Sequence, residues 1–367
     1  MSPINIIMAP CLQSDGWISV SACNSNVIER LKAHSNINLR ICNPLLGSIN
    51  NKWIRALVRH IFYPLTVKRT ISNSPPDSIL HVTDQYYAPL IRFKPLRSVV
   101  TCHDLILFRF SDISPRQRER WFRRVAYAKK ANAVMAVSEC TAKDLQLFGG
   151  VPSDKIIVNH NGRDPFFRIL TDGHNYGPAA SAVRKMRTDR ILLLSLGHNV
   201  IQKNLARLLS SVDRLRAVGL PVTVIKAGAA LDKDYQRIAI GKEPDQDLII
   251  NLGYVSKQDV LELYNSCHML VFPSLYEGFG LPVIEAQACG LPCITSKISS
   301  LPEVGGNAAL YCDPESADDI ADKISILAKD QSLQAELRNK GMTNIMRFSW
   351  DRHVESLVNV YSKLATK

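Results

Sequence analysis

The sequence of 367 residues lacks long apolar runs, paired cysteine motifs and a basic leader. No stretch of about eighteen uninterrupted apolar residues occurs, so we expect no membrane-spanning helix. The opening residues, MSPINIIMAP, carry no basic head, which argues against a secretory signal. The nine cysteines include no C-x-x-C pair, so we expect neither a disulfide framework nor a zinc site, and we interpret Cys289 and Cys293 as buried small hydrophobes. These absences predict a cytoplasmic protein.

Positive charge is concentrated in the first part of the chain. Residues 1–150 contain 20 Lys and Arg against 9 Asp and Glu, whereas the remainder has 25 against 24. The densest stretch is SPRQRERWFRRVAYAKKAN, in which Ser114 can cap a helix and Pro115 suits its first turn. Such a helix can lie on an anionic membrane, hold an anionic acceptor, or turn its aromatic side chains inward and its charges to solvent. No nucleic-acid signature accompanies the charge, so we expect no nucleic acid partner.

Short apolar runs rich in β-branched residues alternate with longer segments of helical period. This alternation predicts an α/β fold with two doubly wound parallel sheets. The expected strands are INIIMAP, NLRICNPL, ILHVTD, SVVTCHD, AVMAVS and KIIVNHN in the first half, and RILLLSLG, VTVIKAGA, LIINLG, HMLVFPS and CITS in the second. A segment rich in Gly, Asn and Asp separates the halves, so we expect one domain over residues 1–175 and another over 176–348.

The last residues, 349–367, have the period of an amphipathic helix. Its predicted apolar face consists of Val354, Leu357, Val360, Tyr361 and Leu364.

The stretch RILLLSLGHNVIQKNLARLL reads as a strand, a loop opened by Gly197 and a helix that begins near Lys203 and Asn204. Free N–H groups at a helix start, together with a lysine, can hold a diphosphate. Neither Gly-x-x-x-x-Gly-Lys nor Gly-x-Gly-x-x-Gly is present, so a purely structural junction remains an alternative.

A second strand end leads into SLYEGFGLPVIEAQACGLP, residues 274–292. Its glycines allow backbone to approach a ligand closely, Pro282 starts a short helix and Gly290 ends it. Glu277 and Glu285 can accept hydrogen bonds from the hydroxyls of a ribose or a hexose. The alternatives are that Glu285 stabilises its own helix and that Glu277 is a solvated loop acid.

Residues 274–314 closely resemble the Glu-x7-Glu region of the retaining GT-B glycosyltransferases of family four. The resemblance continues in LIINLGYVSKQDVLELYNSCHMLVFPS, VSECTAKDLQLFGGVPSDKIIVNHNGRDP, HVTDQYYAPL, VVTCHD and FSWDRHVESLVNVY. It therefore covers essentially the whole chain. It implies two Rossmann-like domains facing across a cleft, with the acceptor held by the first, the nucleotide-sugar by the second, and the C-terminal helix packing back on the first.

The resemblance also implies roles for single residues. His103, Lys203 and Glu277 are the implied catalytic residues, with Lys203 on the diphosphate and His103 facing the donor sugar. The implied donor-binding residues are Gly16, His198, Gln202, Lys203, Tyr254, Val255, Glu277, Gly278, Phe279, Gly280, Leu281 and Glu285. Among them Glu285 holds the ribose, and Tyr254 and Val255 lie near the base. The acceptor residues implied are Asp84, Tyr86 and Tyr87.

The chain departs from the family pattern at two places. The arginine that commonly precedes the diphosphate lysine is missing, and the candidate positions are occupied by His198 and Gln202. The first glycine-rich loop is reduced to Gly16. The departures put the rate and the donor in question.

The resulting prediction is a retaining hexosyltransferase that acts on a glycan or glycolipid acceptor, without metal or other cofactor, in contact with the inner face of the cytoplasmic membrane. GDP-mannose is the first choice of donor, while UDP-glucose and dTDP-rhamnose stay open. The main alternative is a catalytically weak subunit that binds a nucleotide-sugar or polysaccharide. A sugar-nucleotide epimerase or a phosphorylase fits the Glu-x7-Glu loop poorly.

Overall fold

The computed structural model describes residues 3–12, 15, 17–42, 51–93, 97–110, 114–231 and 247–366. The chain forms two compact units, one of Met1–Gly162 with Ser349–Lys367 and one of Arg163–Phe348. The division follows Gly162, whereas the sequence placed it at 175/176. The reason is that residues after Gly162 are bound to the second unit, where Leu170 N–H donates to Asn265 Oδ1 at 2.9 Å and Gly177 N–H to Glu262 Oε2 at 2.8 Å.

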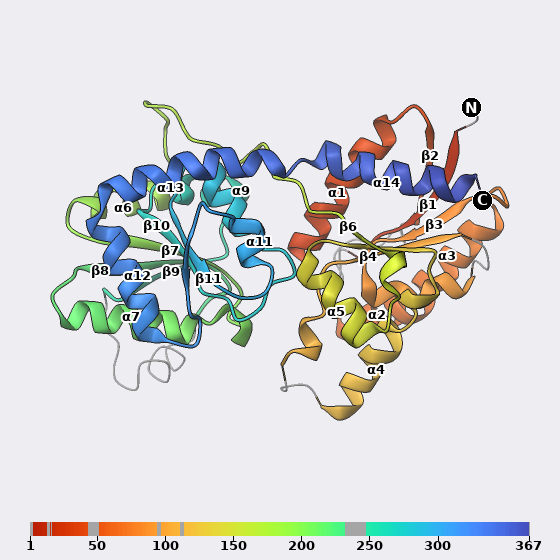
Figure 1. Ribbon diagram of the computed structural model, residues 1–367, viewed down its shortest axis with the longest axis horizontal. Coiled ribbons are helices and arrows are strands. Elements are labelled where there is room, and N and C mark those ends of the chain that lie inside the picture. Colours follow the sequence, from red (N-terminus) through yellow and green to blue (C-terminus); the bar gives the residue numbers. More distant parts are fainter. Residues whose placement is uncertain are drawn as a thin grey trace. The chain divides into compact units, whose positions relative to one another are not determined.

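The first unit is built on a parallel sheet whose six described strands follow the order β2-β1-β3-β4-β5-β6 (Figure 1). The strands are β1 (Ile4–Ala9), β2 (Ile37–Ile41), β3 (Ile79–Val82), β4 (Ser98–Cys102), β5 (Ala133–Ala136) and β6 (Ile156–Val158). The helical segments are α1 (Ile18–Ala33), α2 (Lys52–Leu57), the π-helical η2 (Val58–Phe62), α3 (Tyr63–Ser72), η3 (Gln85–Phe93), η4 (Ile106–Phe108), α4 (Pro115–Val125), η5 (Ala128–Lys130), α5 (Glu139–Gly149), η6 (Ser153–Lys155) and α14 (Trp350–Ala365).

Helices cover both faces of this sheet. Because successive strand residues point to opposite faces, Ile7 and Ala9 enter the core that α3, η3, α4 and α5 complete. On the other face α1 and α14 contact β1 and its neighbours. The predicted start of the basic helix is confirmed, since Ser114 forms a capping box with Gln117 and Pro115 lies in the first turn of α4.

The second unit repeats this architecture with the described strand order β12-β11-β10-β7-β8-β9. Its strands are β7 (Ile191–Gly197), β8 (Val222–Gly228), β9 (Ile249–Gly253), β10 (Met269–Phe272), β11 (Cys293–Ser296) and β12 (Leu310–Cys312). Its helical segments are α6 (Pro178–Lys185), η7 (Met186–Thr188), η8 (Ile201–Lys203), α7 (Leu205–Ala217), α9 (Lys257–Tyr264), α10 (Leu281–Ala288), α11 (Leu301–Gly305), α12 (Ala317–Lys329), α13 (Gln331–Asn344) and η9 (Ile345–Arg347).

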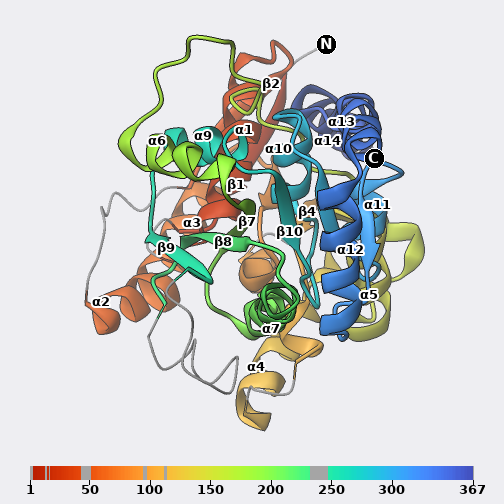
Figure 2. The same cartoon turned by 90° about the vertical axis from the view of Figure 1, so that its left-hand side faces the viewer.

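Helices α7 and α12 lie side by side on one face of the second sheet, and α6 and α9 lie on the other (Figure 2). The eleven strands that the sequence predicts are all present. The additional strand β12 has only three residues, which is too short for a recognisable alternation. The nine cysteines are free, and Cys289 and Cys293 are buried as expected. Among the described residues, no helix combines the length and apolarity needed to span a bilayer.

Helix α14 belongs to the first unit and closes its core. The five residues of its predicted apolar face are buried, as the sequence indicates. Tyr361 also shares a hydrogen bond of 2.5 Å with Nδ1 of buried His81, while Nε2 of that histidine contacts Thr101 Oγ1 at 2.8 Å. Gly162 allows α14 to begin where it does, because a Cβ at this position would lie 2.2 Å from the backbone nitrogen of Trp350.

We therefore expect Leu357→Ala to destabilise the first unit. Leu357 is fully buried, so its truncation should lower the free energy of unfolding by about 2–5 kcal/mol, measured by urea denaturation. The exposed Glu355 on the same helix is the control, and Glu355→Ala should change the free energy by less than about 0.5 kcal/mol. Equal effects of the two variants would mean that α14 does not contribute to this core.

Candidate functional site

The loops that follow β7 and β10 are joined at the carboxyl ends of these two neighbouring strands. Leu275 N–H donates to the carbonyl of Gln202 at 2.8 Å. Asn204, buried in a left-handed conformation, donates from Nδ2 to the carbonyl of Pro273 at 2.9 Å. In an open α/β sheet this edge is where ligands bind. The two loops that the sequence singled out are therefore adjacent in space.

Lys203 and Glu277 meet between these loops. Lys203 Nζ lies 2.7 Å from Glu277 Oε1, with 23% and 14% of the two side chains exposed. The ammonium group also lies 4.7 Å from the centre of the Phe272 ring. Partial burial makes the pair stronger than a surface ion pair, yet an ammonium can donate three hydrogen bonds. Lys203 can thus hold Glu277 and still donate to an incoming anion.

A second lysine lies close to this pair and was missed by the sequence analysis. Lys226 of β8 is only 2% exposed, and its Nζ donates to the carbonyls of Gly197 at 2.5 Å and Ala227 at 3.2 Å. Burial and then the charge of Lys203 lower the pKa of Lys226 from 10.5 to about 8. The sequence signal was a lysine inside the apolar strand VTVIKAG. The edge therefore carries two cations.

The loop from Glu277 to Leu281 is held by the serines that follow β11. Glu277 N–H donates to Ser299 Oγ at 3.0 Å, and Ser300 Oγ donates to the carbonyls of Glu277 and Phe279 at 2.9 and 2.8 Å. Gly280 has φ 107°, and a Cβ there would lie 2.8 Å from Leu301 Cδ2. Steric contact with Leu301 therefore explains the glycine at position 280. The serine hydrogen bonds hold the loop in this conformation without a ligand.

Gly278 and Phe279 lie within this loop, and Leu281 is the first residue of α10. Among the described side chains, none caps the start of this helix. Pro282 has no N–H, and Val283 N–H donates to the carbonyl of Gly280 at 3.0 Å, so this helix start favours an anion mainly through the positive end of its dipole.

Glu285 lies in the second turn of α10 and faces α9. Tyr264 OH donates to Glu285 Oε2 at 2.9 Å and lies 3.3 Å from the carbonyl of Pro282. Burial raises the pKa of Glu285 from 4.5 to about 7, against the opposing effect of the Tyr264 hydrogen bond. A carboxylate with one oxygen fixed by a tyrosine is a preset acceptor for a diol. Glu285 is held by Tyr264 of α9, whereas Glu277 is paired with Lys203.

His198 and Tyr254 are brought together from the ends of β7 and β9. The tyrosine hydroxyl lies 3.5 Å from His198 Nδ1, and the tyrosine side chain is well exposed. Val255 is half-buried and directly precedes Ser256, the N-cap of α9. These residues form an open aromatic surface at the same sheet edge. Gly16 lies outside the described residues.

His103 lies in the first unit directly after β4. Its backbone N–H donates to Gln85 Oε1 at 2.9 Å, and its Nε2 lies 3.0 Å from the carbonyl of Thr83. A carbonyl only accepts, so Nε2 carries the proton. Burial lowers the pKa of His103 to about 4. The imidazole is neutral at physiological pH, with Nδ1 as the acceptor.

The three predicted acceptor residues are more buried than expected of a binding surface. Asp84 is 2% exposed and accepts a hydrogen bond of 2.7 Å from Tyr86 N–H, which starts η3. Burial raises the pKa of Asp84 well above its usual range. Tyr86 packs edge-on against Trp121 at 5.0 Å, and Tyr87 OH donates to Asp15 Oδ2 at 2.6 Å. Tyr87 also lines a cavity beside α4.

In the part of the chain that the structure describes, no group of three or more His, Cys, Asp or Glu residues is arranged to hold a metal ion.

Known proteins resemble both units in sequence. The family described as Glycosyl transferases group 1 matches residues 179–343, and Glycosyltransferase Family 4 matches residues 29–166. O-antigen chain mannosyltransferase B of Escherichia coli is 27% identical over 278 residues, which cover 73% of this chain and 71% of that protein. The serotype-specific mannosyltransferase WbdA of Escherichia coli is 27% identical over 74% of this chain. The match spans about a third of WbdA, 34% of its length.

Solved structures share the complete fold. HepE of Anabaena, crystallised with UDP and glucose, superposes with a TM-score of 0.72 at 17% identity, over 98% of this chain and 100% of that chain. Sucrose-phosphate synthase of Thermosynechococcus elongatus gives a TM-score of 0.75 at 16% identity, over 98% and 99% of the two chains. With both units matched in sequence and fold, the chain belongs to the family 4, group 1 glycosyltransferases of the GT-B fold.

Proposed function

We propose that this protein transfers a hexose, mannose from GDP-mannose as first choice, to a glycan or glycolipid acceptor with retention of the anomeric configuration and without a metal ion. The choice of mannose is supported by the mannosyltransferases among its relatives. The observation that carries the proposal is the cationic edge of the second sheet, where Lys203, with Lys226 as its neighbour, pairs with Glu277 of the loop that leads into the uncapped start of α10.

The proposed reaction requires charge stabilisation more than proton chemistry. The bond between the anomeric carbon and the diphosphate oxygen breaks, and its electron pair stays on the diphosphate. Lys203 and the helix dipole of α10 stabilise that developing charge. The acceptor hydroxyl attacks from the side that the diphosphate leaves, and its proton passes to a diphosphate oxygen. No covalent sugar-enzyme bond forms in this scheme.

His103 has the role of a neutral group in this proposal. Its Nε2–H is committed to the carbonyl of Thr83, so only Nδ1 can interact with substrate, as an acceptor. A neutral acceptor can orient a sugar hydroxyl and favour positive character at the anomeric carbon. An imidazolium would oppose that character.

The alternative of a catalytically weak binding subunit rests on the missing arginine. His198 is placed beside Tyr254 and Gln202 supplies only a backbone carbonyl to Leu275, so neither replaces the arginine charge. Lys226 offers a positive charge from a different strand, next to Lys203. We therefore favour the enzyme over the binding subunit.

Turnover of donor tests this proposal. The purified protein, given GDP-mannose, UDP-glucose or dTDP-rhamnose with and without magnesium, should release nucleoside diphosphate from one of them in either condition. Lys203→Met should lower that rate by about a hundredfold or more, because it removes a cation at the leaving group. The control is Lys329→Met, because Lys329 is an exposed residue of α12. No turnover of any donor, with nucleotide still bound, would favour the binding subunit.

Glu285→Gln should separate a ribose-binding role from a structural one. We expect calorimetry to show that the variant binds nucleotide about tenfold more weakly, or weaker still, because a charged acceptor is lost. The same change should raise the free energy of unfolding above pH 7 by roughly 1–3 kcal/mol. The reason is that folding keeps ionised Glu285 from water, at a pKa of about 7 instead of 4.5. Below pH 4.5 the carboxyl is protonated in both states, so the gain disappears.

Exposed Glu315→Gln is the matched control for both measurements. A destabilised Glu285→Gln protein with normal nucleotide affinity would contradict the ribose role.

Nucleoside diphosphate binding should also depend on the protonation of Lys226. Its pKa is about 8 in the free protein, so Lys226 is charged below this pH and neutral above it. Lys203, paired with Glu277, is the charged neighbour that lowers this pKa. We expect affinity to fall as the pH rises from 7 to 9 in the wild type. Lys226→Met should bind more weakly at pH 7 and lose this slope in calorimetry. A slope that persists in the variant would assign it to another group.

A further inference from the structure

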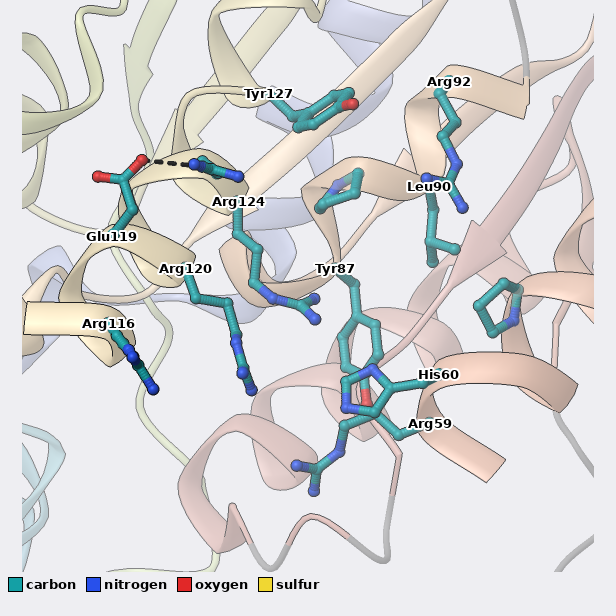
Figure 3. A pocket seen from close by; sticks show the side chains of 13 residues that line it. Arg59, His60, Tyr87, Leu90, Arg92, Arg116, Glu119, Arg120, Arg124 and Tyr127 are labelled. Atoms are coloured by element: carbon teal, nitrogen blue, oxygen red, sulfur yellow. Dashed lines mark hydrogen bonds and ion pairs between the residues drawn. The ribbon is translucent and has the colours of Figure 1, made fainter. Parts of the chain in front are cut away.

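Six arginines line a cavity of about 520 Å³ in the first unit (Figure 3). They come from three elements, with Arg59 on η2, Arg92 on η3 and four on α4. Its arginines are Arg59, Arg92, Arg116, Arg120, Arg123 and Arg124, its histidine is His60, and its one acid is Glu119. Arg116, Arg120 and Arg124 follow the helical spacing of four residues, so they project from one side of α4 toward His60 and Arg59. We call this the arginine pocket.

The positive charge of the arginine pocket is only partly neutralised. Arg59 pairs with Asp15, and Arg123 Nε lies 2.8 Å from Glu119 Oε1. The described residues provide no carboxylate partner for the remaining four arginines, Arg92, Arg116, Arg120 and Arg124. Arg124 stacks on Tyr86 at 4.1 Å, and its buried Nε has no hydrogen-bond acceptor. Burial and then the charges of Arg124, Arg59 and Arg120 lower the pKa of His60. The pocket thus lacks counter-charge.

The wall of the arginine pocket continues into an exposed apolar surface. Pro64 lines the pocket, and the next residue, Leu65, is 56% exposed. The large exposed hydrophobic residues of the helical run α2-η2-α3 are Trp53, Ile54, Leu57, Ile61, Phe62 and Leu65. Most of them recur at intervals of four, which puts them on one side of this run. We call them the apolar stripe. An exposed stripe of this size on a folded protein indicates a binding surface.

We propose that the first unit binds a lipid diphosphate, with the two phosphates in the arginine pocket and the hydrocarbon chain along the apolar stripe. The inference rests on the proposed function in one respect, since this lipid diphosphate is then the anchor of the glycan acceptor. Planar guanidinium groups bind phosphate oxygens in pairs, and arginines from three elements can surround two linked phosphates at once.

The shape of the site favours one lipid over a bilayer surface. A flat layer of anionic headgroups is matched by cations on a convex or planar face. Here the cations converge on a cavity whose lining also includes Tyr87, Pro89 and Leu90. A cavity suits a discrete polyanion, and the adjoining stripe suits its single chain. Tyr87, predicted to contact the acceptor, is the one predicted acceptor residue that lines it.

Three soluble probes separate the parts of the site. Calorimetry on the full chain would compare inorganic diphosphate, geranyl diphosphate and geraniol. We expect geranyl diphosphate to bind more tightly than inorganic diphosphate, and geraniol to bind least. Arg116→Ala/Arg120→Ala should weaken both diphosphates by about tenfold or more, since two charge-assisted contacts are lost. Ile54→Ser/Leu65→Ser should weaken geranyl diphosphate alone.

Matched controls exist for each variant. Arg118→Ala removes one charge from α4 outside the pocket, and Leu147→Ser removes an exposed apolar side chain from α5. Each should change affinity by less than about twofold. An equal loss in Arg118→Ala and in the double arginine variant would overturn the proposal, because general electrostatics would then explain binding. Tight binding to phosphatidylglycerol vesicles that ignores the double arginine substitution would overturn it as well.

The test is independent of the donor site. Geranyl diphosphate binding that disappears in Lys203→Met would show that the probe occupies the nucleotide subsite, and would overturn the proposal. Nucleotide binding is measured separately on the wild-type protein. Its absence would contradict the proposed function, while selective loss of geranyl diphosphate in the arginine variant would still establish the lipid site.

Discussion

The parallel alignment of all strands in both sheets determines where this protein can carry chemistry. A parallel strand needs a crossover helix before the next one begins, so each unit is covered on both faces and its strands are apolar. Ligand-binding groups are then expected at the carboxyl ends of the strands and in the loops that follow them. In the second unit, the loops after β7 and β10 are locked together by Asn204 and by the bond from Leu275 to Gln202. This constraint makes distant sequence segments neighbours.

Both candidate sites contain charges that folding leaves poorly compensated. Glu285 and Lys226 have pKa values displaced toward their neutral forms because burial removes them from water. The arginine pocket contains four guanidinium groups without a carboxylate partner among the described residues. Each arrangement costs stability in the free protein, and each would be relieved by a ligand of suitable charge. Displaced pKa values of this kind cluster where proteins bind or react.

The two units differ in charge and in the shape of their candidate sites. The second unit presents a preformed loop, fixed by Ser299 and Ser300, beside an ion pair whose lysine can still donate to an anion. The first unit carries the excess positive charge of the chain, and six of its arginines line one cavity built by η2, η3 and α4. A transferase that uses a nucleotide-sugar and an anionic lipid-linked acceptor needs one site of each kind. The excess positive charge in the first part of the sequence therefore corresponds to the arginine pocket in the first unit.

The sequence by itself determined the α/β class, eleven of the described strands, the N-terminal cap of α4 and the buried face of α14. These features follow from local periodicity and from short motifs that mark the start of a helix, such as Ser114 before Pro115. It also brought forward Lys203, Glu277 and Glu285, because acids and lysines stand out at strand ends. Tertiary structure decided the rest. Lys226 and the partners of Glu285 depend on contacts between strands and helices far apart in the chain. Asp84 and Tyr86 proved buried because η3 packs against α4, and no local pattern encodes that packing.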